Sequence, residues 1–95
     1  MTDVAVTKTE ESGESLTFDV VVSEGSSESR HVVTLSRDDY RAQGDRFSTP
    51  EEFVARCFDF LLEREPKESI LRRFDVRDIG RYFPDFTRDV LHPEE

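Results

Sequence analysis

The feature that most constrains the fold is the run of residues 49–63, TPEEFVARCFDFLLE, which predicts one helix with a very wide apolar face. Thr49 suits the N-cap, Pro50 suits the first helical position, and Glu52 would complete a capping box. At about 100° per residue the apolar side chains cover an arc of about 220°, against about 100° for an ordinary surface helix. The arc consists of Phe53, Val54, Ala55, Cys57, Phe58, Phe60, Leu61 and Leu62. Such a helix has to be covered from two sides, by a sheet and further helices or by a second chain.

Two strands are predicted before this helix. Residues 16–22 alternate between apolar and other side chains, residues 24–29 suit a hairpin loop, and residues 30–35 suit the returning strand. The inward-facing side chains would be those of Leu16, Phe18, Val20, Val22, Val33 and Leu35. Residues 4–9 are rich in β-branched side chains and could add a third strand.

The second half of the chain predicts helices. Ser36 caps a short helix over about 37–43, which Gly44 ends, and the main helix covers about 50–64. Pro66 then breaks the chain, and residues 67–74 predict a short helix that buries Ile70, Leu71 and Phe74. A further helix begins near residue 75, with Ile79 and Phe83 facing inward, and stops at Pro84. Residues 86–91 predict a last turn.

Strands first and helices afterwards indicate an α+β fold. The sheet would be a small antiparallel one, a hairpin or a three-stranded meander, followed by three to four helices packed on one face. The 95 residues suit a single domain over 1–95, with about 1–14 and 92–95 as loose ends. The predicted core consists of Phe18, Val20, Phe53, Cys57, Phe58, Leu61, Ile70, Phe74 and Ile79.

The charge of the chain disfavours two classes of partner. The formal net charge is −9, and an acidic chain repels phosphate backbones and anionic lipid, so nucleic acid is an unlikely partner and a membrane is not expected. The N-terminus lacks the basic and apolar segments of a signal peptide. Uninterrupted apolar runs are too short to span a bilayer. These observations favour a soluble cytoplasmic protein.

No motif in the sequence carries recognisable chemistry. Cys57 lies inside the apolar arc, where a thiol packs as a small hydrophobe, and one cysteine forms no intramolecular disulfide. The two histidines, His31 and His92, cannot build a tetrahedral zinc site alone. Paired carboxylates stand at predicted helix starts or on the solvent side, where the helix dipole or water accounts for them. We therefore assign no catalytic residue, no metal ligand and no cofactor, and we favour a chain that is not an enzyme.

The least ordinary segment is residues 70–83, in which four arginines stand against two aspartates, a net charge of +2 within an acidic chain. A possible interaction surface there comprises Arg72, Arg73, Arg77, Arg81 and Tyr82. If the helices were continuous, Arg73, Arg77 and Arg81 would share one face. The plainer alternative is that these arginines are solvated or pair with nearby acids.

The function that this sequence favours is a non-catalytic protein-interaction or regulatory module, either a homodimer or a subunit of a complex. Its motivation is the wide apolar helix together with the lack of a chemical motif. One alternative is a small enzyme or ligand-binding domain with a pocket between sheet and helices. A second alternative is a nucleic-acid-binding module that uses the Arg72–Arg81 segment.

Overall fold

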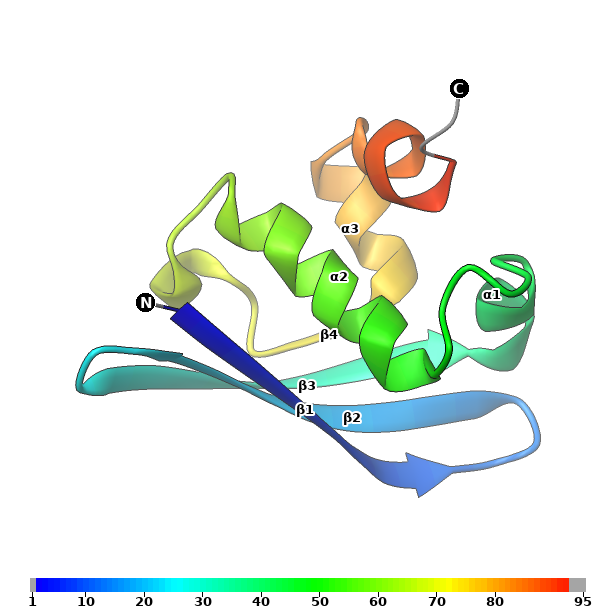
Figure 1. Cartoon of the computed structure of the whole chain (residues 1–95), viewed down its shortest axis with the longest axis horizontal. Helices are drawn as coiled ribbons and strands as arrows, with labels where there is room; N and C mark the ends of the chain where they lie inside the picture. Colours follow the sequence, from blue (N-terminus) through cyan, green and yellow to red (C-terminus); the bar gives the residue numbers. More distant parts are fainter. Residues whose placement is uncertain (1, 93–95) are drawn as a thin grey trace.

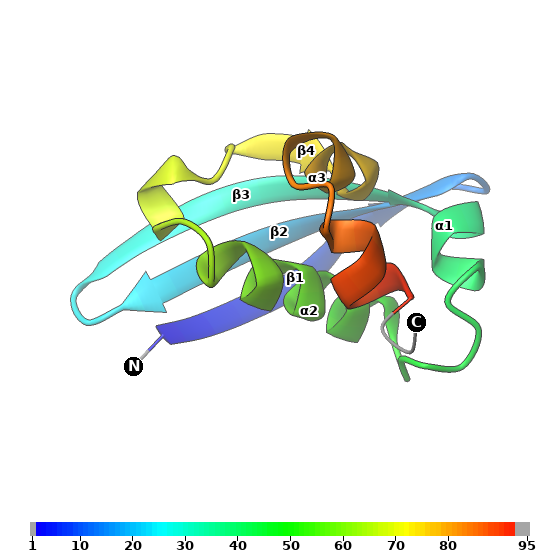
Figure 2. The same ribbon diagram turned by 90° about the horizontal axis from the view of Figure 1, so that it is seen from above.

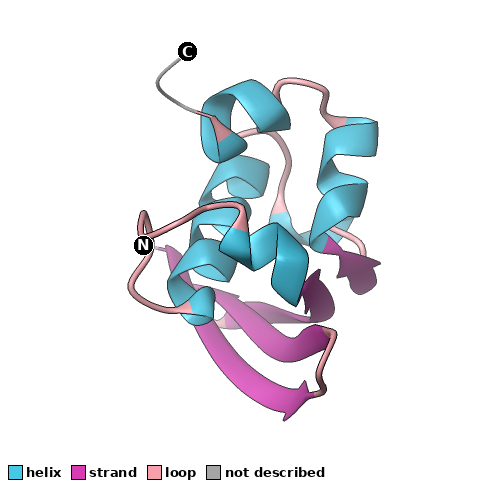
Figure 3. Ribbon diagram, turned by 90° about the vertical axis from the view of Figure 1, so that its right-hand side faces the viewer, coloured by secondary structure: helices cyan, strands magenta, loops and turns pink. Residues whose placement is uncertain are grey.

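A four-stranded sheet carries the helices on one face in the computed structural model, which describes residues 2–92 (Figure 1, Figure 3). The strands are β1 (Thr2–Glu11), β2 (Ser15–Glu24), β3 (Ser27–Ser36) and β4 (Arg73–Asp75), in the spatial order β1-β2-β3-β4. The first three pair antiparallel, and β4 pairs parallel to β3. The predicted α+β fold, a sheet followed by helices, is confirmed.

The helices follow β3 in sequence. They are α1 (Arg37–Arg41), α2 (Pro50–Leu62), the 3-10 turn η1 (Lys67–Ser69), α3 (Val76–Tyr82) and the π-helical turn η2 (Thr87–Leu91). Figure 1 shows α2 lying across the inner face of the sheet, with α3 and the C-terminal turn beyond it. The short α1 ends before Gly44, whose φ of +65° is a conformation that favours glycine.

The sheet follows the predicted alternation and is larger than expected. Residues 2–11, for which the sequence left open a strand over 4–9 or a loose end, form β1 and pair with β2. The β2–β3 connection is shorter than predicted, because Glu24 already pairs with Ser27. Gly25, with φ +63°, opens this two-residue turn. The second predicted loose end was residues 92–95, and residues 93–95 lie outside the described residues.

The predicted helix over 67–74 is wrong. After η1 the chain becomes extended, and β4 pairs with β3, beginning with a 2.7 Å bond from the Val32 N–H to the Arg72 carbonyl (Figure 2). The positions of Ile70, Leu71 and Phe74 suit a helix and also suit an extended segment that buries Ile70 and Phe74. The extended form is favoured because its backbone can pair with the open edge of β3. Asp75, the N-cap of α3, also has extended dihedrals.

The wide apolar face of α2 is covered by the chain itself. On the sheet side, the centre of the Phe58 ring lies 5.4 Å from the centre of the His31 ring and 5.9 Å from the centre of the Phe74 ring. On the other side, the Phe60 ring packs edge-on against Phe83 and Phe86. The buried residues of the helix are Phe53, Val54, Cys57, Phe58, Phe60 and Leu61, and all the predicted core residues are buried. The sheet and the C-terminal segment therefore account for the wide arc, and the expectation that a second chain is needed to cover it is not supported.

The start of α2 confirms the predicted cap. The Glu52 N–H donates to the Thr49 Oγ1 at 3.2 Å. The reciprocal half of the box is displaced by one residue, because Glu52 Oε1 accepts from the Ser48 N–H at 2.9 Å rather than from Thr49.

We expect Thr49→Ala to lower the free energy of unfolding by about 0.5–2 kcal/mol, because the Glu52 N–H loses its acceptor. Thr49→Ser, which keeps the hydroxyl, is the matched control and should lose much less. Urea denaturation of the three proteins measures the difference. Equal stability of the alanine and serine variants would contradict a capping role for Thr49.

Candidate interaction groove

The two large hydrophobic side chains that are exposed within residues 2–92, Leu71 at 50% and Tyr82 at 67%, border the same cavity. This cavity has a volume of about 340 Å³. Its lining consists of Leu61, Glu65, Ser69, Ile70, Leu71, Phe74, Asp78, Ile79, Tyr82 and Phe83, and we call it the Leu71 groove. Monomers rarely expose adjoining apolar side chains beside a hollow without a reason. The groove is therefore the strongest candidate for a functional site.

Three parts of the chain build the groove. The C-terminal end of α2 supplies Leu61, the segment from η1 to β4 supplies Leu71, and α3 supplies Tyr82. Figure 2 shows this arrangement from above, with α3 following β4 and α2 lying across from both. The position of Leu71 at the groove depends on the pairing of β4 with the sheet. The predicted helix over 67–74 would have buried Leu71 instead.

His31 holds the Leu71 wall in place. The His31 ring is buried in β3, and its Nδ1 lies 2.7 Å from the Leu71 carbonyl oxygen. Because a carbonyl oxygen only accepts, Nδ1 carries the proton and donates it, and in the neutral ring Nε2 accepts from the Ser29 hydroxyl at 2.8 Å. Sequence reasoning gave His31 no role. The period-two pattern that placed Val33 inward also places His31 inward, so the signal was present.

The other wall, α3, is fixed by its own start. The Asp75 carboxylate accepts from the Arg77 N–H at 3.0 Å, and Asp78 Oδ2 accepts from the Asp75 N–H at 3.1 Å. The Asp75 side chain also accepts from the Asp78 N–H, so Asp75 and Asp78 form a capping box that fixes the start of the helix carrying Ile79 and Tyr82. Asp78 thereby has one oxygen committed to the helix start, and its other oxygen accepts from Arg81 Nη1 at 3.3 Å.

The charged residues in the lining of the groove, Glu65 and Asp78, are both acidic, and Arg81 lies next to Tyr82 on α3 outside the lining. Glu65, just after α2, is half-buried and makes no ion pair with any residue of the described range 2–92. Arg81, on α3, is 78% exposed and pairs only with Asp78 within that range. An exposed pair of this kind contributes little stability, so Arg81 can exchange its partner at low cost.

The five residues of the predicted interaction surface do not gather into one patch. Tyr82 borders the groove, and Arg81 lies next to it on α3. Arg77 pairs with Asp39 and Asp75 instead. Arg73 lies in β4 beside the inward-facing Phe74, so it points to the outer face of the sheet. Arg72 lines a separate cavity, and a continuous arginine face is absent because β4 interrupts the expected helix.

That separate cavity, of about 350 Å³, is lined by Glu28, Ser29, Arg30, His31, Lys67, Glu68, Ile70 and Arg72. Lys67 is its unexpected member, since the side chain is only 3% exposed. Lys67 Nζ donates to Glu68 at 2.6 Å and lies 3.8 Å from Glu24, and the hydrogen bond to Glu68 raises the pKa of Lys67. Nothing in the sequence around Pro66 signalled this burial. The lining holds three cationic side chains, those of Arg30, Lys67 and Arg72, against the two carboxylates of Glu28 and Glu68.

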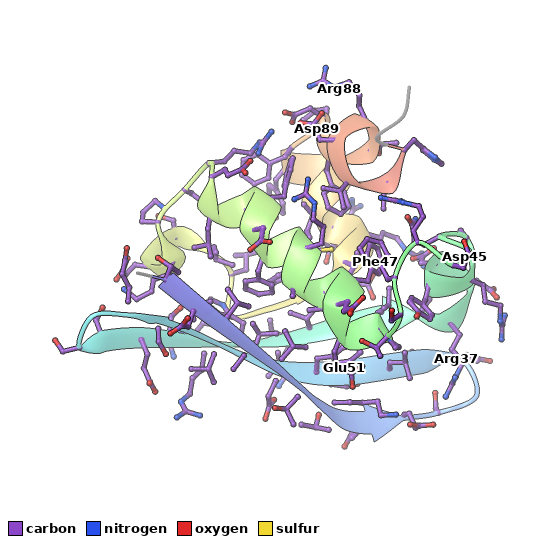
Figure 4. The ribbon with its side chains drawn as sticks, in the orientation of Figure 1. Arg37, Asp45, Phe47, Glu51, Arg88 and Asp89 are labelled. Carbon is purple, nitrogen blue, oxygen red and sulfur yellow. The ribbon has the colours of Figure 1, made fainter. Side chains whose placement is uncertain are left out.

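A cluster of ion pairs ties the C-terminal turn to α2. Arg64 Nη2 binds Asp85 at 2.9 Å and Asp89 at 3.0 Å, and its guanidinium stacks 3.6 Å from the centre of the Phe60 ring. Arg88 adds a second bond to Asp89, and both residues are marked on the C-terminal turn in Figure 4. The hydrogen bond from Arg64 lowers the pKa of Asp85, and the hydrogen bond from Arg88 lowers the pKa of Asp89, each from an ordinary 3.8.

These lowered pKa values predict acid sensitivity. A carboxyl whose pKa is lower in the folded state stabilises the fold above its unfolded pKa, and that stability is lost as the pH falls through the folded value. We expect the free energy of unfolding to decline below about pH 4, and to decline less steeply in Arg64→Gln. Urea denaturation between pH 2.5 and 6 measures both slopes, with Arg41→Gln, from the exposed pair with Asp38, as the control. Equal slopes in Arg64→Gln and the wild type would contradict the assignment.

Cys57 has the surroundings of a packed side chain. It is 1% exposed, and burial raises the pKa of its thiol far above the usual range. Residues 2–92 contain no group of three or more His, Cys, Asp and Glu side chains placed to hold a metal ion. In the same range no helix is long and apolar enough to cross a membrane.

We expect Cys57 in the native protein to react with a thiol reagent far more slowly than in the urea-unfolded protein, because the reactive thiolate is neither accessible nor stabilised. The time course of labelling, followed by mass spectrometry in both states, provides the measurement. Rapid labelling of the folded chain would reopen a redox or nucleophilic role for this thiol.

Comparisons with protein families, with curated proteins and with solved structures found no match to this chain.

Proposed function

We propose that this chain is a non-catalytic protein-interaction module and that the Leu71 groove is its binding surface. The observation that carries the proposal is that Leu71 and Tyr82, both exposed, border one apolar hollow. Tyrosine is enriched among the few residues that dominate the energetics of protein interfaces, and apolar neighbours help to exclude water around such residues. The polar residues of the rim, Glu65 and Asp78, would set the orientation of a partner rather than its affinity.

The test is affinity purification of the tagged chain from its source cells in three forms. Leu71→Asp places a charge at the groove, and Thr7→Asp places the same charge on the outer face of β1. We expect at least one protein to be recovered with the wild type and with Thr7→Asp and to be lost with Leu71→Asp. An untagged copy of the chain itself would count as such a protein. Identical recovery with all three forms would contradict the proposal.

A second candidate function is binding of a small apolar ligand. The groove volume of about 340 Å³ lies at the lower end of the range for small-molecule sites, and Ser69, Glu65 and Asp78 supply polar groups beside an apolar floor. A ligand of this kind would raise the midpoint of thermal unfolding of the wild type. Stabilisation by a small molecule that Leu71→Asp abolishes would favour this candidate over a protein partner.

A further inference from the structure

We propose that a second cavity binds a small uncharged molecule with a carbonyl group, and that the side-chain amide of Gln43 donates a hydrogen bond to that carbonyl. The cavity has a volume of about 270 Å³, and its lining comes from α1 and the residues just after it, from α2, from α3 and from the C-terminal turn. We call it the Gln43 cavity. It shares no lining residue with the Leu71 groove, so the inference goes beyond the proposed function.

The amide of Gln43 has an unused donor at this cavity. Its Oε1 accepts from Arg46 Nη1, and because a guanidinium only donates, this contact fixes which end of the amide is oxygen. The Nε2 group makes no hydrogen bond to any residue in the range 2–92, although Gln43 is only 6% exposed. No side-chain nitrogen or oxygen in that range is both fully buried and without a partner. Nε2 therefore faces accessible space, which the cavity provides, and an acceptor placed there would satisfy it.

The chemistry of the lining favours an uncharged ligand. Gln43 is the only glutamine in the chain, which has no asparagine, so this donor is its one neutral side-chain amide. The two formally charged side chains in the lining offset each other, since Arg77 Nη2 donates to Asp39 at 3.4 Å. The net charge of −9 also disfavours an anion. A neutral donor beside a balanced pair of charges suits a carbonyl oxygen.

The interior of the cavity is apolar and small. The buried side chains of Phe53, Val76 and Phe86 line it. Its volume exceeds the roughly 150 Å³ of an apolar cavity that binds benzene, and it lies just below the range of about 300–1,000 Å³ for drug-sized ligands. We therefore expect a ligand with a single ring and a short substituent that carries the carbonyl group.

Gly80 is a second observation that points to a ligand. It lies inside α3, where glycine is a poor helix former, and its φ is not positive, so the backbone does not require glycine. A methyl group at this position would lie 4.0 Å from Phe86 Cδ2 and 4.0 Å from Thr87 Oγ1, which is ordinary contact, so these neighbours do not require glycine either. All three residues line the cavity. Close approach of a ligand to the helix would account for a glycine here.

The experiment follows the side-chain amide of Gln43 in the two-dimensional nitrogen–proton NMR spectrum of the purified chain. Because the chain has no other carboxamide side chain, its pair of signals is unambiguous. The probe is acetophenone, a single ring with a short ketone substituent, added up to millimolar concentration. We expect the Gln43 signals to shift and to saturate. Ethylbenzene, which has a similar shape and no carbonyl, should bind about tenfold more weakly, because it leaves the donor unsatisfied.

Substitutions at Gly80 locate the site. Gly80→Leu would fill the cavity and should abolish the shift. Gly80→Ala, which favours the helix and clashes with nothing, should weaken binding of acetophenone about tenfold. Gly13→Ala is the matched control, because it adds the same methyl group where nothing lies within 4 Å, and it should leave binding unchanged. Leu71→Asp should also leave binding unchanged, which separates this cavity from the groove. Circular dichroism confirms that each variant is folded.

Gln43→Glu tests the donor itself, because it keeps an oxygen for Arg46 and removes the amide nitrogen. Binding to this variant, followed at the backbone amides of residues 80–87, should weaken about tenfold. Four results would overturn the inference: Gln43 signals that acetophenone leaves in place, equal binding of acetophenone and ethylbenzene, full binding to the Gly80 variants, or loss of binding in Leu71→Asp.

Discussion

Replacement of Phe58 by alanine is expected to lower the free energy of unfolding by about 3–5 kcal/mol. Phe58 is fully buried and joins α2 to the sheet, since its ring packs against His31 of β3 and Phe74 of β4. The truncation leaves a cavity where the two layers meet, and the surrounding side chains can relax only partly. Small domains are stable by only about 5–15 kcal/mol, so the variant is expected to be partly unfolded at moderate temperature.

Thermal and urea denaturation followed by circular dichroism provide the measurement for Phe58→Ala. Phe58→Leu is the matched control, because leucine retains most of the apolar volume and should cost markedly less. A midpoint of unfolding for Phe58→Ala that equals the wild-type midpoint would contradict the placement of α2 on the sheet.

Replacement of Phe60 by alanine is expected to have an effect of similar size, about 3–5 kcal/mol, on the opposite side of α2. The Phe60 ring makes edge-on contacts with Phe83 at 6.1 Å and Phe86 at 5.2 Å, and the Arg64 guanidinium lies over its face. Aromatic pairs of this geometry stabilise a fold by more than the burial of their apolar area alone. Loss of the Phe60 ring should therefore loosen the C-terminal segment as well as lower the global free energy of unfolding.

Hydrogen exchange distinguishes the two phenylalanines. In Phe60→Ala the amides of residues 83–91 should lose more protection than those of β2 and β3, because the contacts removed lie between α2 and the C-terminal turn. Asp59→Ala, at an exposed neighbouring position, is the control and should change stability by no more than about 0.5 kcal/mol. Uniform loss of protection throughout the chain would contradict a separate C-terminal cover on α2.

The sequence predicted α2 well because local signals and burial agree there. Thr49 caps the helix, Pro50 opens it, and the apolar residues follow a helical period, so no distant contact is needed to define it. The strands β2 and β3 were predictable for the same reason, since their alternation marks one buried face. In these elements the local preference and the tertiary environment point to the same structure.

The strand β4 was not predictable from the sequence, because local and tertiary preferences differ there. Ile70, Leu71 and Phe74 fit a helix by spacing alone, and the parallel pairing with β3 that decides the matter involves residues about forty positions earlier. One local signal did bear on the arginine face. Asp75 was recognised as a helix start, and an N-cap residue is extended, so one continuous helix could not have carried Arg73 together with Arg77 and Arg81.

The groove could be predicted only in part. Leu71 and Tyr82 both belong to the segment 70–83 that the sequence singled out, but Leu71 was expected to be buried in a helix, and Glu65 was among the acids expected at helix starts or on the solvent side. Each of these residues acquires its position from an element that is distant in sequence, such as His31, which holds the Leu71 carbonyl. A surface assembled from three separate segments leaves no spacing pattern in any one of them.

The measurement that tests the interaction surface most directly is photo-crosslinking in the source cells. A photoreactive amino acid replaces Tyr82 in one strain and Thr7, on the outer face of β1, in another. We expect discrete adducts from position 82, either of twice 11.1 kDa or with one other protein, and none above background from position 7. Adducts that are absent at position 82, or that have the same pattern at both positions, would contradict the assignment of the Leu71 groove as the binding surface.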